Sequence, residues 1–317
     1  MMKSWRFHEF GSLDNLRLED IPVPEPQHNE ALIRLEFAAL NPADAYLIRG
    51  KYPRAGTPPF AVGRDGCGVI ERCPEGRFKP GDRVVILRSD IGVTREGTLA
   101  EYVCVPEDSL APLPHGWSPE EGAAGPLVFL TAWQALVTKG DIASGKTVLV
   151  DGASGGVGTA AVMLAHAYGA RVIALSRDAK KRRRLVELGA HAALDTADPG
   201  LEKQVKEALG GGRADIVIEN LAGPYLQKSI NLAAEQGRIM IVGLLAGLSG
   251  CADRPRPNTT GNRSSSGWTV STSVRWWIEF FRCWKYRARL VIWRADRWGK
   301  WWWMSAIPAG GNRGNAE

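Results

Sequence analysis

The sequence predicts an α/β protein of two domains, in which a mainly β domain precedes a doubly wound parallel sheet. Two observations support this fold class. Short apolar or alternating runs separated by turns fill the first 115 or so residues, and no long amphipathic helix interrupts them. From about residue 119, strands alternate with helices of 10 to 15 residues, which is typical of a parallel sheet covered on both faces.

The mainly β domain is expected over 1–118. Its clearest strand signals are the runs ALIRLEFAAL (31–40), GDRVVIL (81–87) and TLAEYVCV (98–105). The segment 119–140 then has helical apolar spacing and ends in a glycine, so it is expected to be helical.

The parallel-sheet domain is expected over 119–250. Its strands are expected at 146–152, 171–176, 192–195, 214–220 and 238–243, and its helices at 158–169, 178–189, 200–210 and 223–237. Right-handed crossovers between successive parallel strands then produce a doubly wound fold.

A glycine-rich loop joins the first strand of this sheet to the helix after it. The dinucleotide pattern GxGxxG falls on 153, 155 and 158, with Ala153 in the first place. Gly155 lets the backbone approach a pyrophosphate, and Gly158 lets the helix pack closely on the strand. The helix N-terminus presents unpaired N–H groups to phosphates. We expect a dinucleotide cofactor held by Ala153, Ser154, Gly155, Gly156, Val157 and Gly158.

The tip of the next strand bears on the choice of cofactor. An NAD site needs an Asp or Glu there for the ribose 2′-hydroxyl, but this strand ends in Ser176, followed by Arg177 and then Lys181. The absence of a carboxylate and the presence of cations favour NADP, with Ser176 and Arg177 near its 2′-phosphate. For Arg182–Arg184, the rest of a basic run, we favour a solvated helix face.

Several motifs occur in one order: GRDGCGVIE, FKPGDRVV, GTLAEYVCVP, PLVFLTAWQAL and GASGGVG. Over roughly residues 1–250, the chain resembles the medium-chain dehydrogenase/reductase superfamily, in its zinc-free quinone oxidoreductase or alcohol dehydrogenase-like branch. The resemblance implies a GroES-like β-barrel domain and a Rossmann domain. It also implies hydride transfer from NADPH to a quinone or to the β-carbon of a conjugated enone.

The resemblance also suggests site residues. Asn41, Tyr46 and Tyr52 would line the pocket in front of the nicotinamide. Packing at a strand or turn edge is an equal alternative for the two tyrosines. Asp44 and Asp65 match acidic positions for which we expect mainly structural roles. The resemblance places Thr131 beside the cofactor, and the expected cofactor site also includes Lys181, Asn220 and Gly243.

Catalytic zinc is not expected. Zinc-dependent relatives have Cys, His and Cys where this chain has Asn41, Arg64 and Leu127, none of which is a typical zinc ligand. The five cysteines are scattered without a CxxC, and the five histidines form no spaced pair in the sequence.

The last part of the chain, 251–317, differs from the rest. It contains 12 Lys+Arg against 4 Asp+Glu and nine of the 12 tryptophans, whereas the first 250 residues contain 28 Lys+Arg against 30 Asp+Glu. The family pattern stops where this composition begins, which suggests a shifted reading frame. We expect a poorly ordered tail that leaves the parallel sheet with an open edge and the chain with reduced stability or activity.

The sequence therefore favours an NADPH-dependent, zinc-independent oxidoreductase in the cytoplasm, acting on a small quinone or enone. A homodimer is typical of the family, although the dimer segment is missing here. Neither nucleic acid nor a membrane is an expected partner, because the overall charge of +6 comes from the tail. Two alternatives remain: an alcohol or aldehyde dehydrogenase-like reductase, and a nucleotide-binding protein without turnover whose basic aromatic tail binds membrane or nucleic acid.

Overall fold

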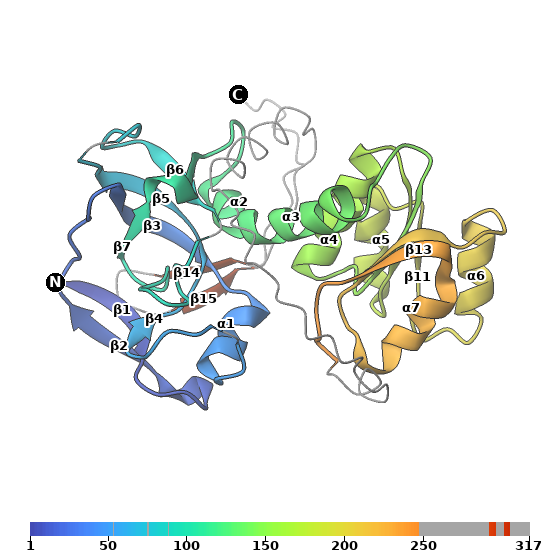
Figure 1. The fold of residues 1–317 in the computed structure, drawn as a ribbon, viewed down its shortest axis with the longest axis horizontal. Coiled ribbons are helices and arrows are strands. Elements are labelled where there is room, and N and C mark those ends of the chain that lie inside the picture. Colours follow the sequence, from blue (N-terminus) through green and yellow to red (C-terminus); the bar gives the residue numbers. More distant parts are fainter. Residues whose placement is uncertain (53, 75, 88, 247–291, 296–300, 305–317) are drawn as a thin grey trace, which may run out of the picture. The chain divides into compact units, whose positions relative to one another are not determined.

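The structure, a computed structural model, describes residues 1–246 except 53, 75 and 88, together with the strands at 292–295 and 301–304 (Figure 1). The chain forms two units that divide between Leu127 and Val128. This division falls later than the boundary expected at 118, because helix α2 (Pro119–Ala124) packs on strands of the first unit. A mainly β unit followed by a parallel sheet confirms the predicted fold class.

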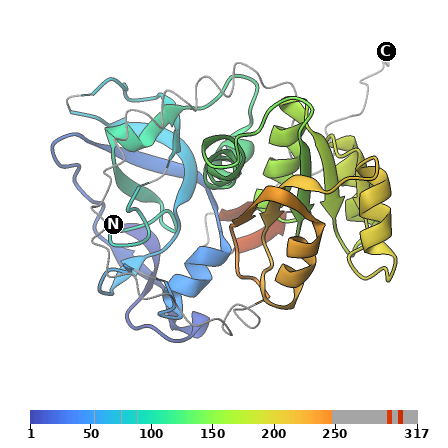
Figure 2. The same ribbon diagram turned by 45° about the vertical axis from the view of Figure 1, so that its right-hand side comes forward.

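Unit 1 is built from antiparallel strands that curve around a common interior (Figure 2). Residues Ile33, Ile70 and Val84 lie in its main core cluster, each at most 1% exposed. The strands are β1 (Met2–Phe7), β2 (Leu16–Ile21), β3 (Glu30–Ala39), β4 (Phe60–Ala61), β5 (Asp65–Arg72), β6 (Arg83–Ile86), β7 (Tyr102–Pro106) and β8 (Leu110–Pro112). The short helix α1 (Pro42–Ile48) follows β3 directly and begins next to Asn41.

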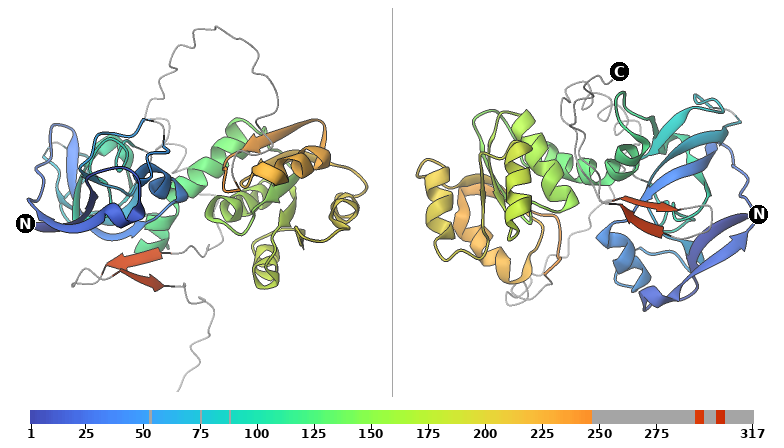
Figure 3. Two further views of the ribbon diagram at one scale, coloured as in Figure 1. Left: turned by 90° about the horizontal axis from the view of Figure 1, so that it is seen from below. Right: turned by 180° about the vertical axis from the view of Figure 1, so that it is seen from behind.

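Two strands from the C-terminal part of the chain join the sheet of unit 1. Strand β14 (Ile292–Ala295) pairs antiparallel with β15 (Trp301–Met304), and Trp293 pairs with Ala38 of β3 (Figure 3). The remainder of 251–317 lies outside the described residues, so the expectations of a poorly ordered, frame-shifted tail stay predictions.

Unit 2 contains the expected parallel sheet. Its order is β11-β10-β9-β12-β13, so the chain runs outward from β9 in one direction and then in the other. Ligands of such sheets bind beyond the carboxyl ends of the strands, where the order reverses, which here is between β9 and β12. The strands are β9 (Thr147–Asp151), β10 (Arg171–Leu175), β11 (Ala192–Leu194), β12 (Ala214–Glu219) and β13 (Ala233–Ile241).

Helices cover both faces of this sheet. Helices α4 (Gly156–Ala167) and α5 (Ala179–Glu187) lie on one face, and α6 (Leu201–Ala208) and α7 (Leu226–Leu232) on the other (Figures 1 and 3). The segment before β9 forms helix α3 (Pro126–Trp133) and a π-helical turn, Gln134–Thr138. Single 3-10 turns lie at Leu13–Asn15, Glu107–Ser109 and Gly223–Tyr225.

One helix prediction was wrong in its second half. The expected helix 223–237 is helical only as far as Leu232, and Ala233 already pairs with Ala214 of β12. Parallel pairing with β12 therefore overrides the helical propensity of the AAEQ segment. Within the described residues β13 is an edge strand, as the sequence predicts.

Two histidines far apart in the sequence lie close together in the structure. His166 and His191, which are not spaced as a pair in the sequence, have ring centroids 6.5 Å apart. Nδ1 of His191 accepts a hydrogen bond from the Val172 amide. Desolvation, Arg171 and His166 all lower the pKa of His191, in that order. The pair therefore favours an uncharged His191 that holds the start of β10.

In the described part of the chain, no helix has both the length and the apolarity that crossing a membrane requires.

Candidate active site and cofactor site

The glycine-rich loop lies where the sequence places it, at the carboxyl end of β9. The Ala153 amide donates to the Leu175 carbonyl at 3.1 Å, which ties the loop to β10. Gly155 is the N-cap of α4, which begins at Gly156. The first turn of α4, which includes Gly156, Val157 and Gly158, therefore directs N–H groups without intrahelical acceptors toward the loop.

The two pattern glycines of the loop differ in their surroundings. A Cβ placed on Gly158 would lie 2.5 Å from the Gly152 carbonyl oxygen and 2.6 Å from the Ala153 Cα. A Cβ placed on Gly155 would have only the Gly152 oxygen within 4 Å, at 3.6 Å. Gly158 is thus required for packing, whereas the space at Gly155 is open and fits the backbone approach of a pyrophosphate.

Two buried carboxylates lie beneath the loop, at the ends of adjacent strands. Asp151 pairs with Glu219 across β9 and β12, and both are fully buried. Oε1 of Glu219 accepts the Leu221 and Ala222 amides, and its Oε2 accepts the Ser229 hydroxyl at 2.5 Å. Oδ1 of Asp151 accepts the Gly152 amide, whereas its Oδ2 has no hydrogen-bond partner.

The pKa of Asp151 reflects this arrangement. Desolvation, followed by the charge of Glu219, raises it to about 6. The two later residues expected around the cofactor lie next to this pair. The Asn220 amide donates to the Asp151 carbonyl at 2.7 Å, and a Cβ placed on Gly243 would lie 2.5 Å from the Asn220 carbonyl oxygen. Asn220 therefore bonds the end of β9, where the loop begins, and Gly243 packs closely against Asn220.

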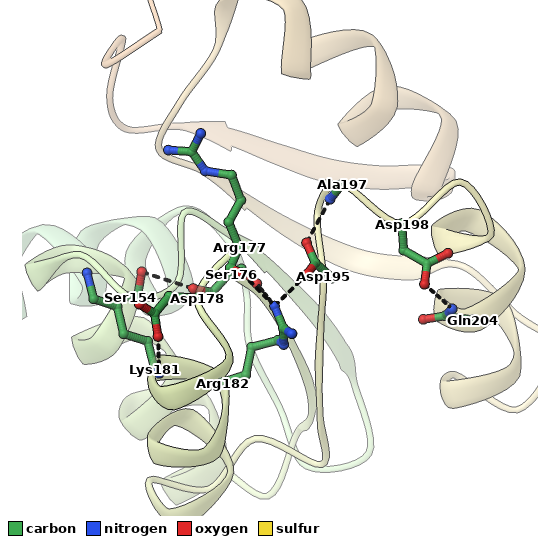
Figure 4. A network of polar contacts seen from close by, with 10 residues as sticks. All are labelled: Ser154, Ser176, Arg177, Asp178, Lys181, Arg182, Asp195, Ala197, Asp198 and Gln204. Atoms are coloured by element: carbon green, nitrogen blue, oxygen red, sulfur yellow. Dashed lines mark hydrogen bonds and ion pairs between the residues drawn. The ribbon is translucent and has the colours of Figure 1, made fainter.

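The tip of β10 lies beside the loop. The Ser176 hydroxyl donates to the Ser154 hydroxyl at 3.2 Å, which joins the two segments (Figure 4). Arg177 and Lys181 are exposed, and neither side chain forms an ion pair with any described residue. The tip thus presents two hydroxyls and two exposed cations, and their contact with a cofactor phosphate stays a prediction.

In unit 1, Asn41 and two buried carboxylates form a polar network. The Asn41 amide group donates to Asp65 Oδ2 at 3.0 Å, and the Asn41 backbone N–H donates to Asp44 Oδ2 at 2.8 Å. Asp65 Oδ1 also accepts the Leu127 backbone N–H at 3.2 Å. Both carboxylates are 2% exposed. Asp44 and Asp65 therefore position the chain around Asn41.

Arg64 extends this network to Tyr52. Its Nη1 donates to the Tyr52 hydroxyl at 2.9 Å, and its guanidinium carbon lies 4.3 Å from the centre of the Tyr52 ring. Its Nε lies 3.8 Å from Asp44 Oδ1, whereas Nε and Nη2 are buried without hydrogen-bond partners. The network thus places the Arg64 cation over the face of the Tyr52 ring and against its hydroxyl.

Burial shifts the pKa values of both carboxylates upward. Desolvation raises the pKa of Asp44 to about 6 and that of Asp65 to about 7, and the charge of Asp44 adds to the shift at Asp65. Hydrogen bonds from Asn41 and the charge of Arg64 oppose these shifts. Arg64 is therefore the main counter-charge of the pair.

The remaining predicted residues, Tyr46 and Thr131, belong to different units of the chain. Tyr46 is half-buried on α1 and forms none of these contacts within the described part of unit 1. Thr131 is half-buried on α3, in unit 2. No group of three or more His, Cys, Asp or Glu side chains suited to a metal occurs in the described residues.

Sequence reasoning assigned no role to two arginines that the structure makes central. Arg64 entered only as a residue that cannot bind zinc, and Arg182 as part of a solvated face. Arg182 instead reaches back to the tip of β10, and its side chain is 22% exposed. Helical phase shows which residues of α5 share a face, but the partner of Arg182 is Asp195, which lies outside α5 and directly follows β11.

Comparison with known proteins gives two matches to family models. Residues 27–115 match the alcohol dehydrogenase GroES-like domain, and residues 156–281 match the zinc-binding dehydrogenase domain, past the expected family limit at residue 250. The chain is 32% identical over 278 residues to a quinone oxidoreductase of Pongo abelii, which covers 87% of this chain and 82% of the relative.

Solved structures show the same likeness. A crystal structure of an NAD-dependent alcohol dehydrogenase superposes with a TM-score of 0.74 at 38% identity, covering 78% of this chain and 79% of that one. The quinone oxidoreductase of Thermus thermophilus, also solved in complex with NADPH, gives a TM-score of 0.65 at 36% identity, covering 76% and 74%. The chain therefore belongs to the medium-chain dehydrogenase/reductase superfamily of nicotinamide-dependent oxidoreductases, in its quinone oxidoreductase-like branch.

Proposed function

We propose that this chain is an NADPH-dependent, zinc-independent reductase that transfers a hydride to a quinone or a conjugated carbonyl compound. When bound, the nicotinamide cofactor supplies the hydride. The residues that would hold it are those of the loop at Gly152–Gly158, with Ser176 and Arg177 at the tip of β10.

The tip of β10 is the observation that carries the choice of cofactor. A site for the ribose 2′-hydroxyl needs a carboxylate there, whereas a site for a 2′-phosphate needs cations and hydrogen-bond donors. Ser154, Ser176 and Arg177 supply donors and a positive charge, and the tip residue itself has no carboxylate. Similar structures include an NAD-dependent enzyme and an enzyme solved with NADPH, so they do not decide between the two cofactors. The residues at the tip of β10 in this chain favour NADPH.

Arg64 supports zinc independence. A guanidinium that is 13% exposed and paired with Asp44 supplies a permanent positive charge where zinc-dependent relatives have a ligand. Such a cation repels Zn²⁺, and it already pairs with the Asp44 carboxylate beside it.

Tyr52 is the best candidate to assist the acceptor oxygen. Guanidinium groups only donate hydrogen bonds, so the Tyr52 hydroxyl must accept from Arg64. Its own proton is then available to an oxygen that gains negative charge during reduction. The half-buried Tyr46 has no such partner among the described residues.

The function is tested by following NADPH oxidation by the full chain. We expect turnover with 1,4-benzoquinone or an α,β-unsaturated ketone, unchanged by EDTA or added zinc. Turnover that requires zinc would contradict zinc independence. Oxidation only with simple aldehydes would favour the alcohol dehydrogenase-like alternative, and NADPH binding without any turnover would favour a nucleotide-binding protein.

The role of Tyr52 makes a separate prediction. Tyr52→Phe removes a hydrogen bond to a charged oxygen, worth roughly 2 kcal/mol, so kcat should fall about 30-fold. The Kd for NADPH should stay unchanged. Tyr46→Phe is the matched control and should change kcat less than threefold. A larger loss in Tyr46→Phe than in Tyr52→Phe would reverse the assignment.

A further inference from the structure

Arg182 binds the segment that joins β10 to α5. Its Nη1 donates to the Ser176 carbonyl at 2.8 Å, the Arg177 carbonyl at 2.9 Å and Asp195 Oδ2 at 2.8 Å (Figure 4). Asp195 follows β11, which is the parallel neighbour of β10. One guanidinium group therefore connects the ends of two adjacent strands.

These contacts fix the direction of two successive peptide planes. In a trans peptide the carbonyl and the following N–H point in opposite directions. With the Ser176 and Arg177 carbonyls facing Arg182, the N–H groups of Arg177 and Asp178 face away from it. Neither N–H donates to an acceptor among the described residues. Two successive N–H groups on the same side of the chain can both donate to one anion.

The side chains at the tip reinforce this polarity. Figure 4 shows the Arg177 side chain extending away from Arg182, and the Ser176 hydroxyl is bonded to Ser154 of the cofactor loop. A cation, two N–H groups and the Ser176 hydroxyl thus belong to the same short segment, and the Ser154 hydroxyl joins them from the cofactor loop. The Asp178 carboxylate keeps its charge and caps α5, where it accepts the Lys181 amide at 2.9 Å, a bond that lowers its pKa.

Arg182 also pairs with the carboxylate of Asp195, which lies at the end of the neighbouring strand. Asp195 accepts hydrogen bonds from the Ala197 amide and from Arg182, and in that order these contacts lower its pKa. Its charge is thereby paired with Arg182. A carboxylate released at the tips of β10 and β11 would repel a 2′-phosphate and suit a 2′-hydroxyl instead.

We propose that Arg182 is a positioning residue for cofactor choice, which directs the tip of β10 toward the 2′-phosphate of NADPH and holds Asp195 away from it. This proposal rests on the proposed use of NADPH. It assigns the selectivity to a residue that need not touch the phosphate itself.

The test is the ratio of NADH to NADPH dissociation constants, measured by titration of the full chain. In Arg182→Gln we expect the preference for NADPH to fall at least tenfold, with the Kd for NADH changed less than threefold. Arg182→Lys should recover part of the preference, since an ammonium can still donate to the carbonyls. Arg183→Gln, an exposed neighbour in the same basic run, should change nothing.

Asp195→Asn keeps a side-chain oxygen for Arg182 but removes the competing charge, so it should retain most of the preference. Loss of both affinities by the same factor in Arg182→Gln would show a general structural role and overturn the proposal. An unchanged ratio would overturn it as well. A wild-type chain that binds NADH as tightly as NADPH would instead refute the proposed cofactor and, with it, this inference.

Discussion

Gly158→Ala should destabilise the chain by about 3 kcal/mol, because the new methyl group has no space. Its Cβ would lie 2.5 Å from the Gly152 carbonyl oxygen and 2.8 Å from the Ala153 carbonyl carbon. These are backbone atoms of the loop, and Ala153 is tied to β10 by its amide. Neither can give way without moving α4 from the sheet.

Gly155→Ala is the matched control, and it should have the opposite profile. Gly155 has a φ of −82°, which alanine adopts readily, and its Cβ would meet only one atom within 4 Å. Stability should therefore be unchanged or should rise by roughly 0.5 kcal/mol through the unfolded state. The methyl group occupies the side where a pyrophosphate would approach, so the Kd for NADPH should rise at least tenfold.

The two variants are compared by urea unfolding without cofactor and by NADPH titration. A Gly155→Ala variant that binds NADPH like the wild type would contradict the assignment of this loop as the phosphate site. A Gly158→Ala variant as stable as the wild type would contradict the close packing of α4 on β9.

The sequence was sufficient for the elements around the cofactor because their signals are local. A strand buried on both faces appears as an apolar run, and β9, β10 and β12 were located in this way to within two residues. The loop was located because the dinucleotide pattern needs a strand before it and a helix after it, and the structure has both. The phosphate-binding role of its glycines and of Ser176 stays a prediction.

What could not be predicted depends on contacts between distant residues. Arg64 reaches Tyr52 and Asp44 across the fold of unit 1, and nothing in the local sequence distinguishes it from a surface arginine. Arg182 stands among five consecutive basic residues, and only the position of Asp195 separates it from Arg183. The end of α7 was missed because pairing with β12 outweighs local helical preference.

The burial of Asp151 beside Glu219 also could not be predicted from the local sequence. A carboxylate at the end of a strand is expected to reach water, yet the register of β9 and β12 buries both side by side. Asp151→Asn should stabilise the chain by roughly 3 kcal/mol at pH 8, because the amide has no charge to bury and can offer a donor in place of the unpartnered Oδ2. Its oxygen can still accept the Gly152 amide.

The sign of the pH dependence follows from the raised pKa. Burial shifts the pKa of Asp151 from 3.8 to about 6, so the folded state holds a proton that the unfolded state releases between these values. Its contribution to stability is fully present below pH 3.8 and is lost as the pH rises through about 6. Asp151→Asn removes this loss, so its advantage over the wild type should shrink between pH 8 and pH 5.

The measurement is the free energy of unfolding in urea at pH 5 and pH 8, for the wild type and two variants. Asp108→Asn, at an exposed carboxylate, should follow the wild type at both pH values. Asp44 and Asp65, whose pKa values burial also raises, have the same sign and contribute equally to all three proteins, so the difference between variants isolates Asp151. An Asp151→Asn variant with the pH slope of the wild type would mean that this carboxylate stays charged beneath the loop.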